Sequence, residues 1–321
     1  MRWVTYDGGA GPRAGVLDGE NVRGLPPVVT VLSLLEGGDL EEAGESARRE
    51  PVEVRPLSDV RLLAPIPRPP SVRDGLCFLD HLRGCRRAMD APDELPAVWS
   101  QAPAFYFASP AAVVGPYDDV VISPGSTMFD LELELGAVIG RPGRDLHPDR
   151  AESHIVGYTL YNDWTARDLQ QLDMAQGIGM GKSKDGAITL GPALVTVDEL
   201  EPYRRDGRPV LEMSAEVNGV ELARGTLDQM DWTFGELLAY LSRGTDLRPG
   251  DVIGSGTVPG GCLLEHVDTP DLADFSRWLR PGDVVSLHAS GIGSTEQTVR
   301  PAPGLTPLRT RAARTAASTT T

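Results

Sequence analysis

The sequence has few cysteines, little lysine and no excess of basic charge. Its three cysteines, Cys77, Cys85 and Cys262, form no CxxC pair among the 321 residues. So sparse a set argues against both a disulfide framework and a structural zinc site. The formal net charge of −16 disfavours nucleic acid as a partner, because phosphate binding requires a basic surface.

Long apolar runs are also absent. No stretch approaches the ~20 residues that a membrane-spanning helix needs, and the N-terminal "MRWVTYDGGAG" lacks the basic start and apolar segment of a signal peptide. We therefore expect a cytoplasmic protein that binds no membrane. The hydrophobic content of 40% and charged content of 24% are typical of a globular enzyme.

Lysine occurs at two positions only, Lys182 and Lys184, both within "GMGKSKDG". All other basic side chains are arginines, which cannot offer a compact cation with an adjustable pKa. A chain that avoids lysine elsewhere either needs it here or carries it by chance.

The composition changes twice along the chain. Residues 1–65 contain short strands and two short helices, for which Thr30 and Asp39 are plausible N-caps. Four prolines between Pro65 and Pro70 mark a boundary. Residues 66–300 are rich in short apolar strands separated by turns, with a helix expected over Phe78–Asp90, and residues 301–321 are of low complexity and predicted to be disordered. The pattern predicts a mostly β protein with added helices.

An acidic stretch within "MFDLELELGAVIG" suggests a metal site. Read as a strand, it places Asp130, Glu132 and Glu134 on one face and the leucines on the other. Two carboxylates spaced by two residues on a strand converge on a point, which suits a hard divalent cation. Asp163, after the apolar run "IVGYTLY", could be a third ligand or an N-cap of the next helix.

Five segments in order resemble the fumarylacetoacetate hydrolase family: "LELELGAVIG", "GYTLYNDWTARDLQQ", "GKSKDGAITLGPALVT", "GDVIGSGTVPGG" and "LRPGDVVSLHASGIG". The resemblance covers about residues 60–300 and is strongest to the fumarylacetoacetase-like subgroup. It implies a mixed β-sandwich roll as the catalytic domain, preceded by a small N-terminal α/β domain. It also implies a homodimer.

The resemblance implies a role for each of ten residues. Glu132, Glu134 and Asp163 match the family's metal ligands, with Asp74 as a further one, and the ion expected is Mg²⁺, or else Ca²⁺ or Mn²⁺. His81, held by Glu265, would be the general base, and Lys182 would stabilise negative charge. Positions that bind substrate or support the site are Arg167, Gln170 and Thr257. Asp130 has no role in the family and is expected at a solvated rim.

Several of these residues also have a structural interpretation that involves no catalysis. His81 could be an ordinary helix histidine, Lys182 a surface charge and Glu265 a solvated loop residue.

The implied reaction is metal-dependent hydrolysis of a C–C bond in a β-diketo or acylpyruvate-like acid. Water activated by His81 would attack, and the metal and a lysine would stabilise the departing enolate. However, Gly75 and Leu76 replace aromatic residues of the subgroup, and Met174 stands where a tyrosine is expected. Fumarylacetoacetate itself is therefore a doubtful substrate. A lyase, isomerase or decarboxylase using the same enolate is the alternative, and a catalytically silent metabolite-binding protein is a further one.

Overall fold

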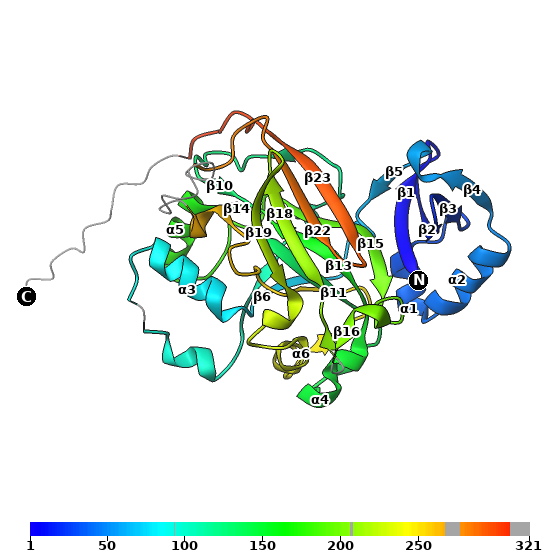
Figure 1. Ribbon diagram of the computed structural model, residues 1–321, viewed down its shortest axis with the longest axis horizontal. Helices are drawn as coiled ribbons and strands as arrows, with labels where there is room; N and C mark the ends of the chain where they lie inside the picture. Colours follow the sequence, from blue (N-terminus) through cyan, green and yellow to red (C-terminus); the bar gives the residue numbers. More distant parts are fainter. Residues whose placement is uncertain (93, 206–207, 267–276, 309–321) are drawn as a thin grey trace, which may run out of the picture.

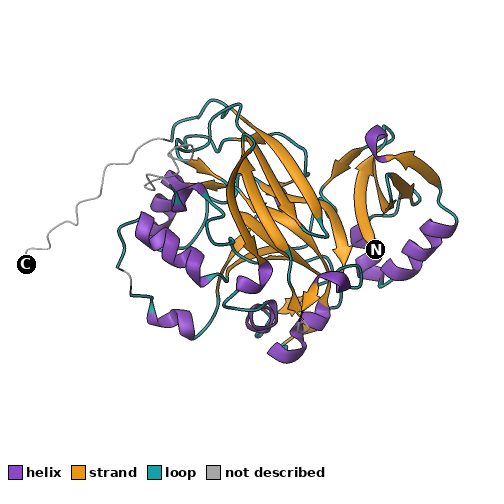
Figure 2. Ribbon diagram, viewed as in Figure 1, coloured by secondary structure: helices purple, strands orange, loops and turns teal. Residues whose placement is uncertain are grey.

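The computed structural model describes residues 1–92, 94–205, 208–266 and 277–308. It confirms a mostly β protein to which a few helices are added (Figure 2). Among these residues, no helix is both long enough and apolar enough to cross a membrane. Most of the tail, 309–321, lies outside the described residues, and residues 301–308 are exposed and without regular structure.

One large sheet runs through the whole molecule. Its order is β4 (Glu53–Pro56), β3 (Asn21–Gly24), β2 (Pro12–Asp18), β1 (Arg2–Asp7), β15 (Ile188–Thr196), β13 (Ile155–Asp163), β11 (Leu133–Ile139), β21 (Val252–Gly254), β6 (Val72–Leu76) and β7 (Ala104–Ala108). Two further strands lie off this path: β5 (Arg61–Leu63) pairs with β1, and β8 (Val113–Val114) pairs with β15.

A second sheet packs against the middle of the first. Its order is β19 (Val220–Thr226), β18 (Glu212–Val217), β22 (Val284–Ala289), β23 (Gly293–Arg300) and β9 (Val120–Val121). Small two-stranded pairs are formed by β10 (Phe129–Asp130) with β14 (Thr165–Ala166), β12 (Gly143–Arg144) with β20 (Asp246–Leu247), and β16 (Arg204–Arg205) with β17 (Arg208–Pro209).

The helices are short and lie outside the sheets (Figure 1). They are α1 (Val31–Gly37), α2 (Leu40–Arg49), α3 (Leu79–Ala88), α4 (Pro148–Ala151), α5 (Arg167–Gln176) and α6 (Phe234–Leu241). Thr30 caps α1 through a reciprocal hydrogen bond with Ser33, as its residue type predicts. Asp39 precedes α2, but within the described chain its side chain makes no capping hydrogen bond.

The alternation in β11 decides which side of the large sheet carries the core. Leu133 and Leu135 face the second sheet and pack in one core cluster with Met213 and Leu287. Glu134 therefore points to the opposite face, away from that core. The predicted separation of leucines and carboxylates holds within the strand.

The acidic stretch is not one continuous strand, because the pairing breaks at Leu131 and Glu132. The amide of Glu132 donates to the side chain of Asn162, and the amide of Leu131 to the side chain of Asp130, in place of ladder partners. Asp130 belongs to β10, which pairs with β14 instead. The break separates Asp130 from the β11 ladder that carries Glu134.

The N-terminal unit forms the right-hand part of Figure 1 and shares the large sheet with the rest of the chain. Strand β1 pairs antiparallel with β15, where Trp3 lies opposite Leu194. Trp3 is completely buried, in a cluster with residues of β15, β13 and β21. The expected boundary near residue 65 is thus crossed by a hydrogen-bonded ladder.

Candidate active site

A cavity of about 320 Å³ opens beside the strand ends of β6 and β11. Polar side chains form one wall, contributed by Asp74, His81, Glu132, Glu134, Arg167, Gln170, Lys184 and Thr257. The cavity lining also contains apolar side chains, which include Leu76, Leu82, Met89, Phe105, Met174 and Leu264. All but three of the residues predicted for the site therefore line this cavity. Asp163 and Glu265 lie directly behind the polar wall, and Lys182 lies away from it.

Three buried carboxylates converge at the polar wall. Oxygen atoms of Asp74, Glu134 and Asp163 lie within 4.8 Å of one another. Strand pairing brings them together, because Asp74 lies opposite Gly254 on β21, and Gly254 in turn lies opposite Gly136 on β11. A Cβ at Gly254 would collide with Asp74 Oδ1, so a glycine leaves the room that this carboxylate occupies.

Glu132 belongs to the same wall but is held by cations. Lys184 Nζ bridges Glu132 and Asp163 at 2.5 Å from an oxygen of each. The Lys184 side chain is 5% exposed, whereas that of Lys182 is 74% exposed and pairs with Asp185. The prediction for Lys182 is therefore wrong by two residues: Lys182 points away from the site, and Lys184 is the lysine that reaches it.

Arg167 is fully engaged in supporting the carboxylates. Its Nε donates to Asp130 at 2.8 Å and its NH2 group to Glu132 at 2.7 Å. Asp130 also accepts the backbone amides of Leu263 and Leu264 and is completely buried. The expectation of a solvated rim position for Asp130 is wrong, because the β10–β14 pair turns it inward beside Arg167.

His81 and Glu265 form a hydrogen-bonded pair at the cavity wall. His81 Nδ1 lies 2.7 Å from Glu265 Oε1, and both side chains are buried. Helix α3 places His81 toward the cavity, and Glu265 comes from the turn after Cys262. A Cβ at Gly84 would collide with Glu265 Oε2, so the glycine one turn along α3 makes room for this carboxylate.

Thr257 and Gln170 contact other site residues. Thr257 Oγ1 donates to Glu134 at 3.2 Å, and Gln170 accepts from Arg167 at 3.2 Å. Both also line the cavity. The site thus brings together every predicted residue except Lys182.

Sequence reasoning missed Tyr106 and assigned the wrong lysine. Tyr106 Oη donates to Asp163 at 2.5 Å, and β7 places Tyr106 directly opposite Asp74. No local motif surrounds Tyr106, so only strand pairing reveals it. Lys184 had a signal, since both lysines of the chain lie in "GKSKDG".

Burial and mutual repulsion set the pKa values of the carboxylates. Burial, with the nearby Asp163, raises the pKa of Asp74 to about 8, and burial with Asp74 raises the pKa of Glu134. Burial would also raise the pKa of Glu132, but Lys184 and Arg167 outweigh it and lower this pKa to about 2. These shifts favour the protonated forms of Asp74 and Glu134 unless another cation replaces their protons.

The surroundings of His81 raise its pKa. Burial acts to lower its pKa, but interactions with Cys262 and Glu265 outweigh burial and raise the pKa to about 10. A raised pKa favours the imidazolium form of His81, which donates a proton more readily than it accepts one.

The residues present fit a hard divalent cation. Within the described part of the chain, Asp163 Oδ1 is buried without a hydrogen-bond partner, and Asp74 and Glu134 are held by backbone and hydroxyl groups. Three converging carboxylates form the oxygen-rich donor set that Mg²⁺, Mn²⁺ and Ca²⁺ prefer. Glu132, which was also predicted as a ligand, is tied to Lys184 and Arg167 and stands next to this set rather than in it.

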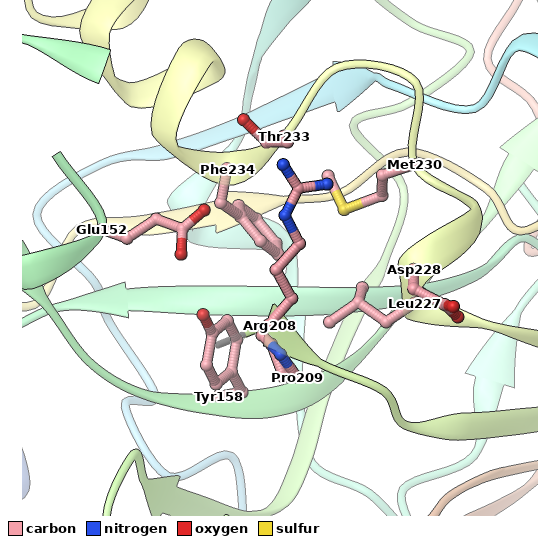
Figure 3. Close-up of a pocket in the computed structure, with 9 residues that line it drawn as sticks. All are labelled: Glu152, Tyr158, Arg208, Pro209, Leu227, Asp228, Met230, Thr233 and Phe234. Atoms are coloured by element: carbon pink, nitrogen blue, oxygen red, sulfur yellow. The ribbon is translucent and has the colours of Figure 1, made fainter. Parts of the chain in front are cut away.

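A smaller hollow lies elsewhere, between β17 and the start of α6 (Figure 3). Its volume is about 30 Å³, and the Arg208 side chain extends across it toward Met230 and Thr233. A space of this size holds about one water molecule and is too small for an organic substrate.

Comparison with known proteins identifies the family to which this fold and this site belong. Residues 71–300 match the family description "Fumarylacetoacetate (FAA) hydrolase C-terminal", and residues 1–65 match "Rv2993c-like, N-terminal". The chain belongs to the fumarylacetoacetate hydrolase family.

Two relatives of this chain share one functional name. The chain is 34% identical over 293 residues to the human mitochondrial oxaloacetate tautomerase FAHD2A, covering 88% of this chain and 86% of the relative. It is 31% identical over 245 residues to the oxaloacetate tautomerase YisK of Bacillus subtilis, covering 76% and 74%. Among solved structures, a fumarylacetoacetate hydrolase from Exiguobacterium antarcticum superposes with a TM-score of 0.73 at 28% identity, covering 94% of this chain and 99% of that one.

Proposed function

We propose that this protein is a divalent-metal-dependent enzyme that interconverts the keto and enol forms of a small 2-oxo dicarboxylic acid such as oxaloacetate. The observation that carries the proposal is that the carboxylate group Asp74–Glu134–Asp163 and the pair His81–Glu265 adjoin one cavity. The names of the two relatives support the same reaction class.

The chain offers both a charged and a proton-transferring side to such a substrate. A divalent cation held by Asp74, Glu134 and Asp163 would supply Lewis-acid polarisation of the substrate's oxygen atoms. Lys184 lies beside this group and offers a fixed positive charge where an enolate oxygen would develop.

His81 is placed to move the proton. Glu265 engages Nδ1, and Nε2 lies 3.6 Å from Cys85 Sγ, a weak partner that a ligand in the cavity would replace. In the enol-to-ketone direction, an imidazolium at His81 would give its proton to carbon while the enol hydroxyl releases its proton to solvent water, and His81 then regains a proton from solvent. In the reverse direction neutral His81 would take the proton from carbon and the enolate oxygen would take one from solvent, so each direction conserves protons.

The apolar part of the cavity lining favours tautomerisation over hydrolysis. Leu76, Phe105 and Leu264 line the cavity and offer no side-chain hydrogen bond that would hold an attacking water. Excluding water protects an enol from side reactions. C–C hydrolysis of an acylpyruvate-like acid is the second candidate, favoured by the retained His81–Glu265 pair, which could also activate water.

The test is a substrate screen on the metal-stripped protein and on the protein supplied with Mg²⁺ or Mn²⁺. The loss of enol absorbance is followed for oxaloacetate, and release of pyruvate or of the second acid is followed for acylpyruvates and fumarylacetoacetate. We expect metal-dependent decay of enol oxaloacetate without pyruvate release. Cleavage products would identify the hydrolase, and pyruvate with CO₂ would identify a decarboxylase.

The variant Glu134→Gln separates metal-dependent from metal-independent catalysis. It removes one of three converging carboxylates without changing its size, so metal binding by calorimetry and turnover should fall together. Activity retained without any metal binding would contradict the proposal. A protein that binds the oxo acids yet converts none of them would belong to the silent class.

A further inference from the structure

A second group of potential metal ligands adjoins the same cavity. It consists of His81 and Cys85 on α3 and of Cys262 and Glu265 in the turn that packs against α3. One ligand atom from each residue lies within 4.8 Å of the others. Two of the three cysteines of the chain belong to this group.

Two distances between the ligand atoms match those of a tetrahedron around zinc. Bond lengths of about 2.3 Å to sulfur and 2.0–2.1 Å to nitrogen or oxygen require ligand atoms about 3.3–3.8 Å apart. Cys85 Sγ lies 3.8 Å from His81 Nδ1, and Cys262 Sγ lies 3.6 Å from Glu265 Oε1. The 2.7 Å contact between His81 Nδ1 and Glu265 Oε1 would have to lengthen.

Apolar residues surround the four ligands, and the cavity gives an ion access to them. Cys85, Cys262 and Leu264 form a small apolar cluster against which Ala88 and Trp278 pack. His81 and Cys85 also line the cavity, so an ion can arrive through it. The absence of a side chain at Gly84 lets Glu265 approach α3 closely.

We propose that His81, Cys85, Cys262 and Glu265 form a binding site for a thiophilic divalent cation such as Zn²⁺, separate from the carboxylate site. Two thiolates and an imidazole select Zn²⁺ over Mg²⁺, whereas the all-carboxylate group selects the hard ion. The site with thiolate ligands would therefore bind Zn²⁺, and the carboxylate site would bind Mg²⁺.

Zinc at this site engages both members of the His81–Glu265 pair. The ion replaces the proton that the two side chains share, so His81 can no longer exchange a proton with a ligand. This consequence rests on the proposed function, under which bound zinc switches the enzyme off, while the site itself does not depend on any activity.

The test uses Co²⁺ as a spectroscopic probe on the full chain, reduced and first saturated with Mg²⁺. We expect one equivalent of Co²⁺ to produce a thiolate charge-transfer band and the visible bands of tetrahedral cobalt, and Zn²⁺ to abolish both by displacement. Cys85→Ala and Cys262→Ala should weaken binding on the order of 100-fold or more, since even second-shell changes can cost that much. Cys77→Ala, at a buried cysteine outside the group, should leave the spectrum unchanged.

The wild-type titration decides the matter without relying on the folding of any variant. Absence of a thiolate band in the reduced wild-type protein would overturn the proposal, as would Co²⁺ binding of unchanged affinity in Cys262→Ala. Glu134→Gln distinguishes the two sites: it should keep the cobalt spectrum even if it abolishes Mg²⁺ binding. Loss of the cobalt spectrum in Glu134→Gln would place the ion in the carboxylate group and overturn the proposal. Because the readout is optical, it stands even if the proposed tautomerase activity is not found.

Discussion

At the scale of single residues, the two lysines show how sharply position matters. They are separated by one serine, yet Lys184 is buried between Glu132 and Asp163 and Lys182 is exposed. A buried cation among carboxylates contributes far more to a site than an exposed one, which solvent screens.

Substituting these lysines is a matched comparison. Lys184→Met should lower turnover by a factor on the order of 100 or more, because it removes a fixed charge from the place where negative charge develops. Lys182→Met should leave turnover nearly unchanged. Steady-state kinetics of both variants with a substrate found in the screen checks this, and equal effects would remove Lys184 from the site.

Asp74 predicts how stability responds to pH when the metal is removed. Its pKa is raised to about 8 by burial and by Asp163, whereas the unfolded chain ionises near the ordinary value of 3.8. Between these values the unfolded state has released the proton and the folded state retains it, so stability falls as the pH rises. The slope for one such proton is about 1.4 kcal/mol per pH unit.

Thermal unfolding in a chelator should therefore show a melting temperature that decreases as the pH rises from mildly acidic toward the folded-state pKa of about 8. Mg²⁺ should restore it most strongly at the higher pH, because the ion replaces the protons. Asp74→Asn should flatten the pH dependence. A melting temperature that rises over this range in the chelator would contradict the proposed protonation of Asp74.

At the scale of elements, α3 and the turn at Glu265 are fitted to each other. The helix turns His81 toward the cavity, and Gly84 leaves the space that the Glu265 carboxylate fills. Glycine within a helix normally costs about 0.5–1 kcal/mol relative to alanine. Here its replacement should harm the protein instead.

Gly84→Ala should displace Glu265 from His81 and reduce both turnover and stability. The added Cβ would collide with Glu265 Oε2, and overpacking of this kind costs about 1–3 kcal/mol. Arg83→Ala, at the neighbouring exposed position, is the control and should have little effect. Chemical denaturation and kinetics measure both quantities, and a stabilised, fully active Gly84→Ala would show that Glu265 does not need this space.

At the scale of the whole molecule, the shared sheet makes the N-terminal unit part of one cooperative structure. Trp3 of β1 is buried in the same cluster as residues of β15 and β13. Trp3→Ala should lower the free energy of unfolding by about 3–5 kcal/mol, whereas Trp3→Phe should cost much less. Calorimetry should show one transition in each, and two separate transitions would mean that the units unfold independently.

A homodimer remains a proposal at this scale. It follows from the family's usual pairing through catalytic domains, and light scattering of the purified full chain tests it. A single species with the 34.4 kDa mass of one chain at all protein concentrations would contradict it.

Many structural elements and several site residues of this protein could be predicted from the sequence alone. The strand-rich second unit, the α1 cap at Thr30, and the site residues Glu134, Asp163 and His81 all follow from local patterns or family segments. Alternation places Glu134 opposite the leucines because a strand has a period of two. A pattern of this kind depends only on neighbours in the chain, so it can be predicted without knowledge of the fold.

Other features were decided by contacts between distant segments. Asp130 turns inward because β10 pairs with β14, and Tyr106 reaches Asp163 because β7 lies beside β6. The choice between Lys182 and Lys184 also depends on which side chain the fold buries, and the order of residues in a loop does not reveal this.

The cysteines separate the two kinds of information most clearly. By spacing, Cys85 and Cys262 form no motif, and the sequence by itself determined only that they are sparse and unpaired by CxxC. The tertiary structure brings both sulfurs next to His81 and Glu265, because α3 packs against a turn 177 residues further along the chain, counted from Cys85 to Cys262. Metal ligands are selected by distance in space, and only the packed fold sets that distance.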